Sequence, residues 1–401
     1  MQATTQRLVT LDFIRGIAVL GILMMNIQFF SQPMSAYGNP TSYGDFTGAN
    51  FWVWLISHLI FDQKFMSIFS ILFGVGIMIF SDNISAKSLS PRRYHYIRMV
   101  LLLGFGLIHG FFIWSGDILV SYALCGMIVY WFRHARSRTL LIISVPLLLI
   151  FWLMLTGIGA LMSTLPNGEL AQEVQASWHP TVSEHQQEIN AYNGSWSMVS
   201  EQRITHTLLI LSDTFLYYPR IIALMLIGMA LYKTGLIKGH KSQASYRDMG
   251  FCFTLLGWMI TAFGIHQNLE HQFAWDYSMF YGVGYNYWGS VFSALGYISL
   301  LIWLSQYLDQ SVIKRALTNV GRMAFTNYIL QSLICTSIIY GYGFALFGAL
   351  SRVEQVIMVI AVWVFLLLFS SIWLQHFRFG PLEWLWRSLT YFSWQPIGHQ
   401  K

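Results

Sequence analysis

The apolar residues of this chain fall into long runs that are separated by short polar segments. A helix needs about 20 predominantly apolar residues to cross a bilayer. By that criterion ten segments are candidate spans, at 8–30, 51–80, 97–115, 118–133, 139–163, 205–232, 248–267, 279–305, 320–348 and 353–376. The second is too long for one straight crossing, and we expect it to begin as an interfacial helix. The pattern predicts an all-α, polytopic transmembrane helix bundle with about ten spans.

The longest polar stretch, 164–204, divides the chain into two halves with five candidate spans each. It is rich in Asn, Gln and Ser and carries five glutamates against one arginine. We expect it to be a non-helical external loop, either a lid or small cap over the bundle or a solvated connector. The expected organisation is therefore 1–163, the loop 164–204, and 205–401 with an interfacial tail. We find no repeat between the halves that supports an inverted-repeat transporter.

Composition and charge agree with this pattern. Only 10% of the 401 residues are charged and 55% are hydrophobic, whereas soluble domains have about 25% charged residues. Of the 23 Lys and Arg residues, 18 fall on the side of the two termini, which predicts that both termini are cytoplasmic. The net charge of +6 thus indicates membrane orientation and not a nucleic-acid partner. We expect a multi-pass protein of the bacterial inner membrane.

The first span carries three polar residues that share one face. Ionisable groups at membrane depth are costly, so each is a candidate functional residue. Asp12 and Arg15 are i,i+3 neighbours that can pair. Asn26 follows Arg15 by about three turns, and its amide needs partners away from water. Helix capping by Asp12 and an Arg15 that reaches the headgroups are equally good interpretations.

Two further spans carry charges. Asp62 and Lys64 lie two residues apart, so on one helix they point to different sides. We therefore expect Lys64 to reach another helix or a ligand. In the sixth span Arg220 follows Pro219, which predicts a broken helix that lines a cavity. Asp213 lies seven residues before Arg220 and shares its face, which fits either a ligand between them or an internal ion pair.

A fourth group lies at the outer end of the third span. His109 sits within the GxxxG formed by Gly106 and Gly110, and Asp117 follows after a short turn. A histidine beside a carboxylate is a common general base, because its pKa lies near operating pH. Asp117 alone is also a good helix N-cap. No other His, Cys or Glu lies at metal-ligand spacing, so no metal site is expected.

Five motifs carry a resemblance to a known family. They are Leu11-Asp12-x-x-Arg15-Gly16, Lys64-Phe65 followed by Leu72-Phe73-Gly74, Ile108-His109-Gly110 with Gly116-Asp117-Ile118-Leu119, Gly321-Arg322-Met323-Ala324-x-Thr326-Asn327-Tyr328, and Gly380-Pro381-x-Glu383-Trp384-x-Trp386-Arg387. Over its full length the chain resembles the YeiB-type, DUF418-containing inner-membrane proteins. Its first half is similar to the transmembrane acyltransferases that include heparan-α-glucosaminide N-acetyltransferase, which transfer acetyl from cytosolic acetyl-CoA to a sugar amine.

The resemblance implies an integral-membrane acyltransferase that uses acyl-CoA, most simply acetyl-CoA. The cations at Arg15, Lys64 and Arg322 are then candidates for the donor's phosphates. In the acetyltransferase relative the active-site histidine follows the first span, but residues 28–50 contain no histidine here. We therefore expect His109 to take its place as the base.

The remaining catalytic roles follow from that assignment. Asp117 would orient the histidine and Asn26 would donate to the oxyanion. The acceptor would be a small molecule or a glycan, among membrane lipids. A homodimer is expected by analogy. The other candidates for a polar pocket are Asp12, Asp62, Asp213, Arg220 and Asn327.

Two other functions remain open from the sequence. In a transporter or flippase of a small solute or lipid-linked intermediate, Asp62, Lys64, Asp213 and Arg220 would bind substrate or protons. A structural or regulatory membrane protein is the third.

Overall fold

The computed structural model describes residues 2–164, 168–309 and 311–398, and these are almost entirely helical. The only β-pairing in these ranges is an isolated bridge between Phe377 and Gly398. The α-helices are α1 (Gln2–Ser31), α2 (Ser35–Gly38), α3 (Gly48–Ile60), α4 (Lys64–Ser85), α5 (Pro91–Ile108), α6 (Leu119–Val129), α7 (Ser137–Thr164), α8 (Glu169–Trp178), α9 (Val182–Tyr192), α10 (Trp196–Lys233), α11 (Gln243–Glu270), α12 (Trp275–Tyr277), α13 (Val283–Tyr307), α14 (Val312–Arg322), α15 (Ala324–Ile339), α16 (Arg352–His376) and α17 (Pro381–Tyr391). The predicted all-α class is confirmed.

Eight helical segments in the described part of the chain are long and apolar enough to cross a membrane. They are Val9–Ser31, Gly48–Ser85, Pro91–Ile113, Ser137–Thr164, Trp196–Lys233, Gln243–Glu270, Trp275–Tyr307 and Arg352–His376. The other two predicted spans correspond to shorter apolar helices, Leu119–Phe132 and Ala324–Ile339. The protein is thus a membrane helix bundle, and the number of crossings stays a prediction.

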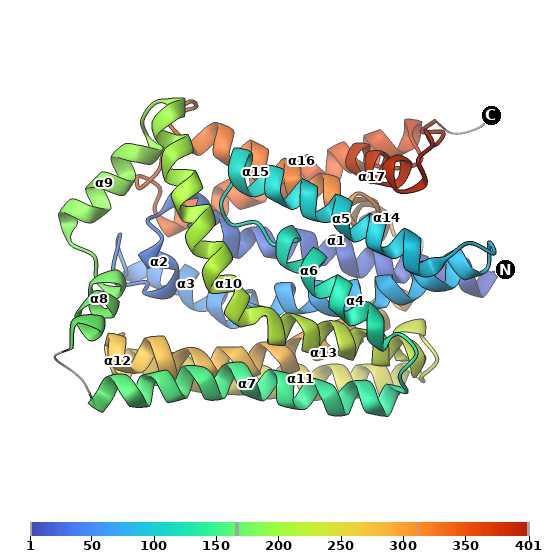
Figure 1. The fold of residues 1–401 in the computed structure, drawn as a ribbon, viewed down its shortest axis with the longest axis horizontal. Coiled ribbons are helices and arrows are strands. Elements are labelled where there is room, and N and C mark those ends of the chain that lie inside the picture. The colour runs from blue at the N-terminus through green and yellow to red at the C-terminus, as the bar shows by residue number, and fades with distance from the viewer. Residues whose placement is uncertain (1, 165–167, 310, 399–401) are drawn as a thin grey trace.

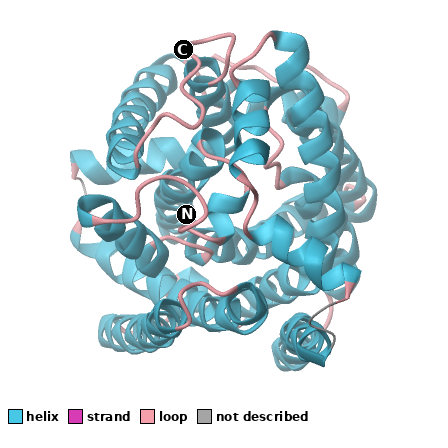
Figure 2. Ribbon diagram, turned by 90° about the vertical axis from the view of Figure 1, so that its left-hand side faces the viewer, coloured by secondary structure: helices cyan, strands magenta, loops and turns pink. Residues whose placement is uncertain are grey.

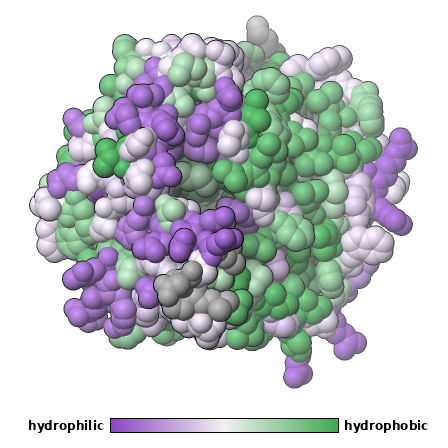
Figure 3. All heavy atoms as spheres, turned by 60° about the vertical axis from the view of Figure 1, so that its left-hand side comes forward, coloured by the Kyte–Doolittle hydropathy of each residue, from purple (hydrophilic) through white to green (hydrophobic). Residues whose placement is uncertain are grey.

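The long helices run in roughly one direction between two distinct ends (Figure 1). One end, here the cap end, carries α2, α8 and α9, while α1 begins and α17 lies toward the opposite end. Figure 2 looks along the bundle from the cap end and shows helices joined by loops. In Figure 3 hydrophilic side chains gather over the cap end, beside a broad hydrophobic band. This division fits a bundle whose sides face lipid.

The stretch 164–204 is largely helical, so the prediction of a non-helical loop is wrong. It contains α8, α9 and the first turns of α10. Thr181 and Glu184 form a capping box at the start of α9, each side chain bonding the other residue's backbone N–H. Low hydropathy concealed these helices, although the Thr-x-x-Glu signal of their start is present in the sequence.

The second and sixth predicted spans differ in where their helices break. The segment 51–80 divides into α3 and α4, because Gln63 adopts a left-handed conformation with φ of 59°. In contrast, α10 continues through Pro219 and only changes direction along its length (Figure 1). The prediction of a broken helix at Pro219 is therefore wrong. A proline removes one helical hydrogen bond and commonly kinks a helix without ending it.

The two halves of the chain share one hydrophobic core, in which residues of α1, α4 and α6 pack with residues of α10 and α13. They also meet at a glycine contact between α1 and α14. A Cβ atom on Gly16 would lie 1.9 Å from the carbonyl oxygen of Leu317, and one on Gly321 would lie 1.7 Å from that of Asp12. Only glycine permits this approach, which fixes α14, and α15 after it, against α1.

Candidate functional site

A chain of three polar side chains is buried where α5, α6 and α15 meet. His109 Nδ1 lies 2.8 Å from Oδ1 of Asp117, and His109 Nε2 lies 2.9 Å from Oγ of Ser332. The exposed fractions of His109 and Ser332 are 1% each, and that of Asp117 is 6%. The expected contact between His109 and Asp117 is therefore present, and Ser332 extends it. We call these three residues the triad.

The contacts of the triad define where its protons lie. An ionised carboxylate only accepts hydrogen bonds, so Asp117 requires a proton on Nδ1 of His109. The Nε2 atom of a neutral His109 is then an acceptor for the Ser332 hydroxyl. The same hydroxyl has a weaker alternative acceptor, the carbonyl of Tyr328 at 3.4 Å. This order of carboxylate, imidazole and hydroxyl is the arrangement that activates a serine.

Local backbone features bring His109 and Asp117 together. Residues His109–Ile113 form a π-helical turn, a feature found frequently at functional sites. Asp117 accepts the N–H of Val120 with its second oxygen at 2.8 Å, so it caps α6 and orients His109 at once. A Cβ atom on Gly106 would lie 2.7 Å from the nitrogen of Val120 and 2.9 Å from Oδ2 of Asp117. The GxxxG motif thus serves packing within the chain.

The triad lies at about the middle of α1. Gln331, next to Ser332, donates to the carbonyl of Val19 at 3.1 Å, and Val19 is near the centre of the span Val9–Ser31. Asn26, the predicted oxyanion donor, is half-buried two turns farther toward the cap end. Within the described part of the chain its amide forms no side-chain hydrogen bond, and it lies about 10 Å along the axis of α1 from the level of Val19, so it is a free donor and not a member of the triad.

A second polar cluster forms at the break between α3 and α4. Asn286 of α13 joins the two charges there, donating to Oδ2 of Asp62 at 2.8 Å and accepting from Nζ of Lys64. Lys64 also donates to the carbonyl of His58 at 2.8 Å, and Nδ1 of His58 lies 3.0 Å from Oδ2 of Asp62. Tyr37 donates to Oδ1 of Asp62 at 3.1 Å. Lys64 does reach another helix, as expected.

Arg220 adds a second cation to this cluster. Its guanidinium donates to Gln63 at 2.6 Å, to Ser67 at 3.1 Å and to Ser290 at 2.6 Å, all neutral side chains. It also lies over the ring of Tyr287, 4.4 Å from the centroid. We call Asp62, Lys64, Arg220 and Asn286 the Lys64–Arg220 cluster.

Asp213 does not belong to that cluster. It is exposed on α10, and among the described residues no ion pair joins it to Arg220. The internal ion pair between these two residues is therefore absent from the described part of the chain.

Arginines gather at the end of the bundle where α1 begins, here the basic end. Arg15 bonds Asp12 at 2.9 Å as predicted, and Arg322 acts electrostatically on the same carboxylate. Arg98 lies in electrostatic range of Arg15 and of Arg387. This set of cations with one carboxylate suits the phosphates of an anionic ligand.

Lys64 is not part of the basic end. Arg15 approaches α4 at Gly76, where a Cβ atom would lie 3.8 Å from its Nη2. Lys64 begins α4, and twelve helical residues span about 18 Å. The expectation that Lys64 joins Arg15 and Arg322 around one set of phosphates is therefore wrong.

Two sequence motifs of the second half hold α15 in place. Glu383 accepts the backbone N–H groups of Phe325 at 2.8 Å and of Thr326 at 3.0 Å, and also the Thr326 hydroxyl. It thereby caps the helix that carries Ser332. Burial raises the pKa of this carboxyl above its ordinary value. Asn327 donates to the carbonyl of Val320 at 3.0 Å and to Ser370 at 2.9 Å, and so links α15 to α14 and α16.

The cap end holds another buried acid. Glu188 of α9 accepts the backbone N–H of Met34 at 3.1 Å and lies 3.9 Å from Nε2 of His206. Burial raises the pKa of Glu188 to about 7. Nothing in the polar sequence around Glu188 indicated this contact, which ties α9 to the chain after α1 and to α10.

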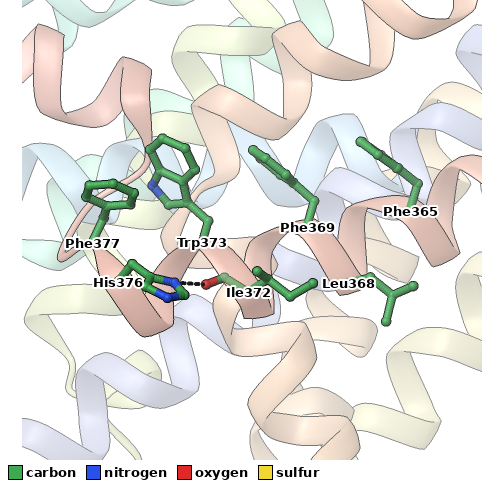
Figure 4. A pocket seen from close by; sticks show the side chains of 7 residues that line it. All are labelled: Phe365, Leu368, Phe369, Ile372, Trp373, His376 and Phe377. Atoms are coloured by element: carbon green, nitrogen blue, oxygen red, sulfur yellow. Dashed lines mark hydrogen bonds between the residues drawn. The ribbon is translucent and has the colours of Figure 1, made fainter.

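A shallow apolar groove on α16 is not a second site. Figure 4 shows its lining, which comes from the single segment Phe365–Phe377, with His376 bonded to the carbonyl of Ile372 at 3.2 Å. An exposed apolar strip along one helix is what lipid tails contact. No group of three or more His, Cys, Asp or Glu residues in the described ranges is placed to hold a metal ion.

Comparison with known proteins agrees with the motifs. A family model described as "Protein of unknown function (DUF418)" matches residues 231–393. The chain is 36% identical to "Uncharacterized protein YeiB" of Escherichia coli (strain K12), with 96% of both chains covered. The chain belongs to this YeiB-type, DUF418-containing family. A second relative, "Uncharacterized protein YxaH" of Bacillus subtilis (strain 168), is 31% identical over 98% of this chain and 96% of its own.

The boundary of the DUF418 match divides both polar clusters. Ser332 and Asn286 lie inside the matched residues 231–393, whereas His109, Asp117 and Lys64 lie before them. Each cluster therefore requires both halves of this family's chain.

Proposed function

We propose that the protein is an integral-membrane acyltransferase that moves an acyl group from cytosolic acyl-CoA to an acceptor across the membrane. The observation that supports this most strongly is the triad, in which Asp117 orients His109 and His109 contacts the hydroxyl of Ser332. A serine activated in this way attacks acyl carbonyl groups. A thioester of CoA presents such a carbonyl.

The basic end supports a donor with phosphates. Arg15, Arg98, Arg322 and Arg387 lie there, and the positive-inside asymmetry predicts that this end is cytoplasmic. The backbone of Arg15 is four residues, or about 6 Å along the axis of α1, from Val19, and its guanidinium extends farther toward the basic end, to Gly76 of α4. A donor held at the basic end by its phosphates would extend its acyl group toward Ser332.

The reaction would proceed in two balanced steps. In the first, Oγ of Ser332 bonds the thioester carbon while its proton passes to Nε2 of His109, and the C–S bond breaks as the CoA sulfur takes that proton. In the second, an acceptor hydroxyl or amine gives its proton to His109 and bonds the acyl carbon. Ser332 then leaves with the proton. The free amide of Asn26 is the candidate donor to the oxyanion.

Labelling with acetyl-CoA tests this proposal. Purified protein in nanodiscs is incubated with acetyl-labelled acetyl-CoA without an acceptor, and we expect CoA release and label on the peptide that contains Ser332. Ser332→Ala and His109→Gln should lose the label, whereas Ser337→Ala, an exposed position on the same helix, should keep it. The proposal is wrong if the wild-type protein neither releases CoA nor becomes labelled.

A transporter of a small solute is the second candidate. The Lys64–Arg220 cluster favours it, because ionisable residues at membrane depth often mark substrate pathways. Uptake of solute by sealed proteoliposomes without CoA would support transport, and CoA-dependent labelling of Ser332 without uptake would support acyl transfer.

A further inference from the structure

The Lys64–Arg220 cluster carries more positive than negative charge. Lys64 and Arg220 are two cations, with exposed fractions of 0% and 1%. Asp62, which Asn286 joins to Lys64, is the single carboxylate among the described residues that acts electrostatically on both. Arg220 bonds neutral side chains alone within the described part of the chain. A buried charge without a counter-charge is strongly destabilising. The cluster therefore lacks one negative charge.

Donors in the cluster also remain unused. The Nε–H of Arg220 is buried and has no hydrogen-bond partner among the described residues. Lys64 has three N–H donors and bonds two acceptors, His58 and Asn286. An oxyanion would accept hydrogen bonds from these unused donors and would neutralise the excess positive charge.

Two other buried arginines show what a structural role looks like in this protein. Arg352 donates to the carbonyls of Asp45 and Pro40, both at 2.7 Å, near the Asp45 carboxylate. Arg203 donates to the carbonyl of Phe111 at 3.0 Å and to Ser200 at 2.9 Å. Each of these two arginines also has one buried N–H without a partner among the described residues, so an unused donor alone does not distinguish Arg220. Both lie toward the cap end and hold backbone segments. Within the described ranges Arg220 bonds no backbone carbonyl, and a second cation, Lys64, lies in its electrostatic range.

We propose that the Lys64–Arg220 cluster binds one singly charged oxyanion, either a carboxylate of a solute or the phosphodiester of an anionic lipid. Lys64 and Arg220 bind its oxygens, and Asp62 limits the site to a single negative charge. Tyr37, which is 42% exposed and bonds Asp62, places the approach on the cap-end side. The site lies apart from the triad and does not depend on acyl transfer.

Thermal unfolding with exchanged anions tests the site. Sodium acetate or sodium dimethyl phosphate replaces sodium chloride at constant ionic strength, and phosphatidylcholine nanodiscs are compared with discs that contain phosphatidylglycerol. Binding to the folded state should raise Tm saturably by roughly 2–4 °C. A response to the soluble anions identifies a solute as the source, and a response to phosphatidylglycerol alone identifies a lipid.

Variants separate this site from general charge effects. Lys64→Gln and Arg220→Gln should lose the response, whereas Lys314→Gln should keep it. Lys314 is the matched control because it is also buried but already bonds Asp309 at 2.8 Å. The proposal is overturned if no oxyanion raises the Tm of the wild type. That result would mean that Lys64 is uncharged and that the cluster is neutral without a ligand. It is also overturned if the response persists without Lys64.

A variant that supplies the missing negative charge gives an independent test, which is needed if Arg220→Gln does not fold. Ser290→Asp would place a carboxylate against Arg220, which Ser290 now bonds at 2.6 Å. We expect a higher Tm without added anion and no further response. Ser299→Asp is the control, because Ser299 is equally buried on α13 and bonds the carbonyl of Leu295; it should lower Tm. If both variants lower Tm alike, the cluster does not lack an anion.

Discussion

The two buried polar clusters lie at a similar depth in the bundle but differ in charge. Ser332 is next to Gln331, which bonds Val19, while Lys64 is next to Phe65, whose ring packs on Gly21 of the same helix. The triad contains one carboxylate and one imidazole, so with a single proton on the imidazole it carries one negative charge. The Lys64–Arg220 cluster contains two cations and one carboxylate. The first cluster is therefore negative and the second positive.

This difference separates proton transfer from charge binding. In the triad, hydrogen bonds run in one direction, from a hydroxyl to an imidazole to a carboxylate, and such a chain can move a proton without gaining or losing charge. In the other cluster the donors outnumber the acceptors, which favours holding an anion. If the comparison is correct, variants in one cluster should leave the property of the other unchanged.

The largest effect is expected from Asp117→Asn. Asparagine has one acceptor oxygen, which the N–H of Val120 requires. Its NH2 group then donates to Nδ1 of His109, so His109 loses the tautomer that accepts from Ser332. We expect acyl transfer to fall on the order of 10³- to 10⁴-fold, as in other triads, while the Tm response to oxyanions is retained. Both expectations are checked on one preparation, by measuring the turnover of acetyl-CoA and the dependence of Tm on added anion. Loss of the anion response together with turnover would show that the clusters act as one site.

An intermediate effect of opposite sign is expected within the second cluster. Asp62→Asn removes the carboxylate that competes with the ligand, so oxyanion affinity should rise about tenfold, or about 1.4 kcal/mol. Lys64→Gln should lower it by at least as much. Titration of Tm against acetate concentration measures both changes. Weakened binding in Asp62→Asn would mean that Asp62 orients Lys64 through Asn286 and does not set the charge of the site.

The fold was predictable from the sequence where hydropathy alone decides it. Long apolar runs indicated the bundle, but two features contradicted hydropathy: the polar stretch 164–204 forms helices, and the apolar segment 51–80 breaks at Gln63. Both depend on local backbone geometry, a capping box in one case and a left-handed residue in the other. Window-averaged hydropathy contains neither.

The candidate sites were predictable where partners are close in the sequence. His109 and Asp117 are eight residues apart, and their contact follows from one turn. Ser332 and Asn286 are more than 200 residues from the partners they bond, and a neutral Ser or Asn in an apolar helix looks like many structural ones. The charge of Lys64 and Arg220 within apolar segments marked both residues as unusual. The tertiary structure was needed to show that they belong to one cluster.

The smallest effect is expected from Glu383→Gln, which tests how far the triad depends on its support. Glu383 caps α15 through the N–H groups of Phe325 and Thr326, and a carboxylate at a helix N-terminus contributes about 0.3–1 kcal/mol by charge. Glutamine keeps the shape of the side chain and one acceptor oxygen. We therefore expect Tm to fall slightly and turnover to fall by severalfold at most. The anion response should not change, because α15 contributes no residue to the Lys64–Arg220 cluster. Glu354→Gln, which alters the capping box of α16, is the matched control for a lost cap charge. A loss of turnover as large as that in Asp117→Asn would mean that the position of Ser332, and not the carboxylate of the triad, limits the reaction.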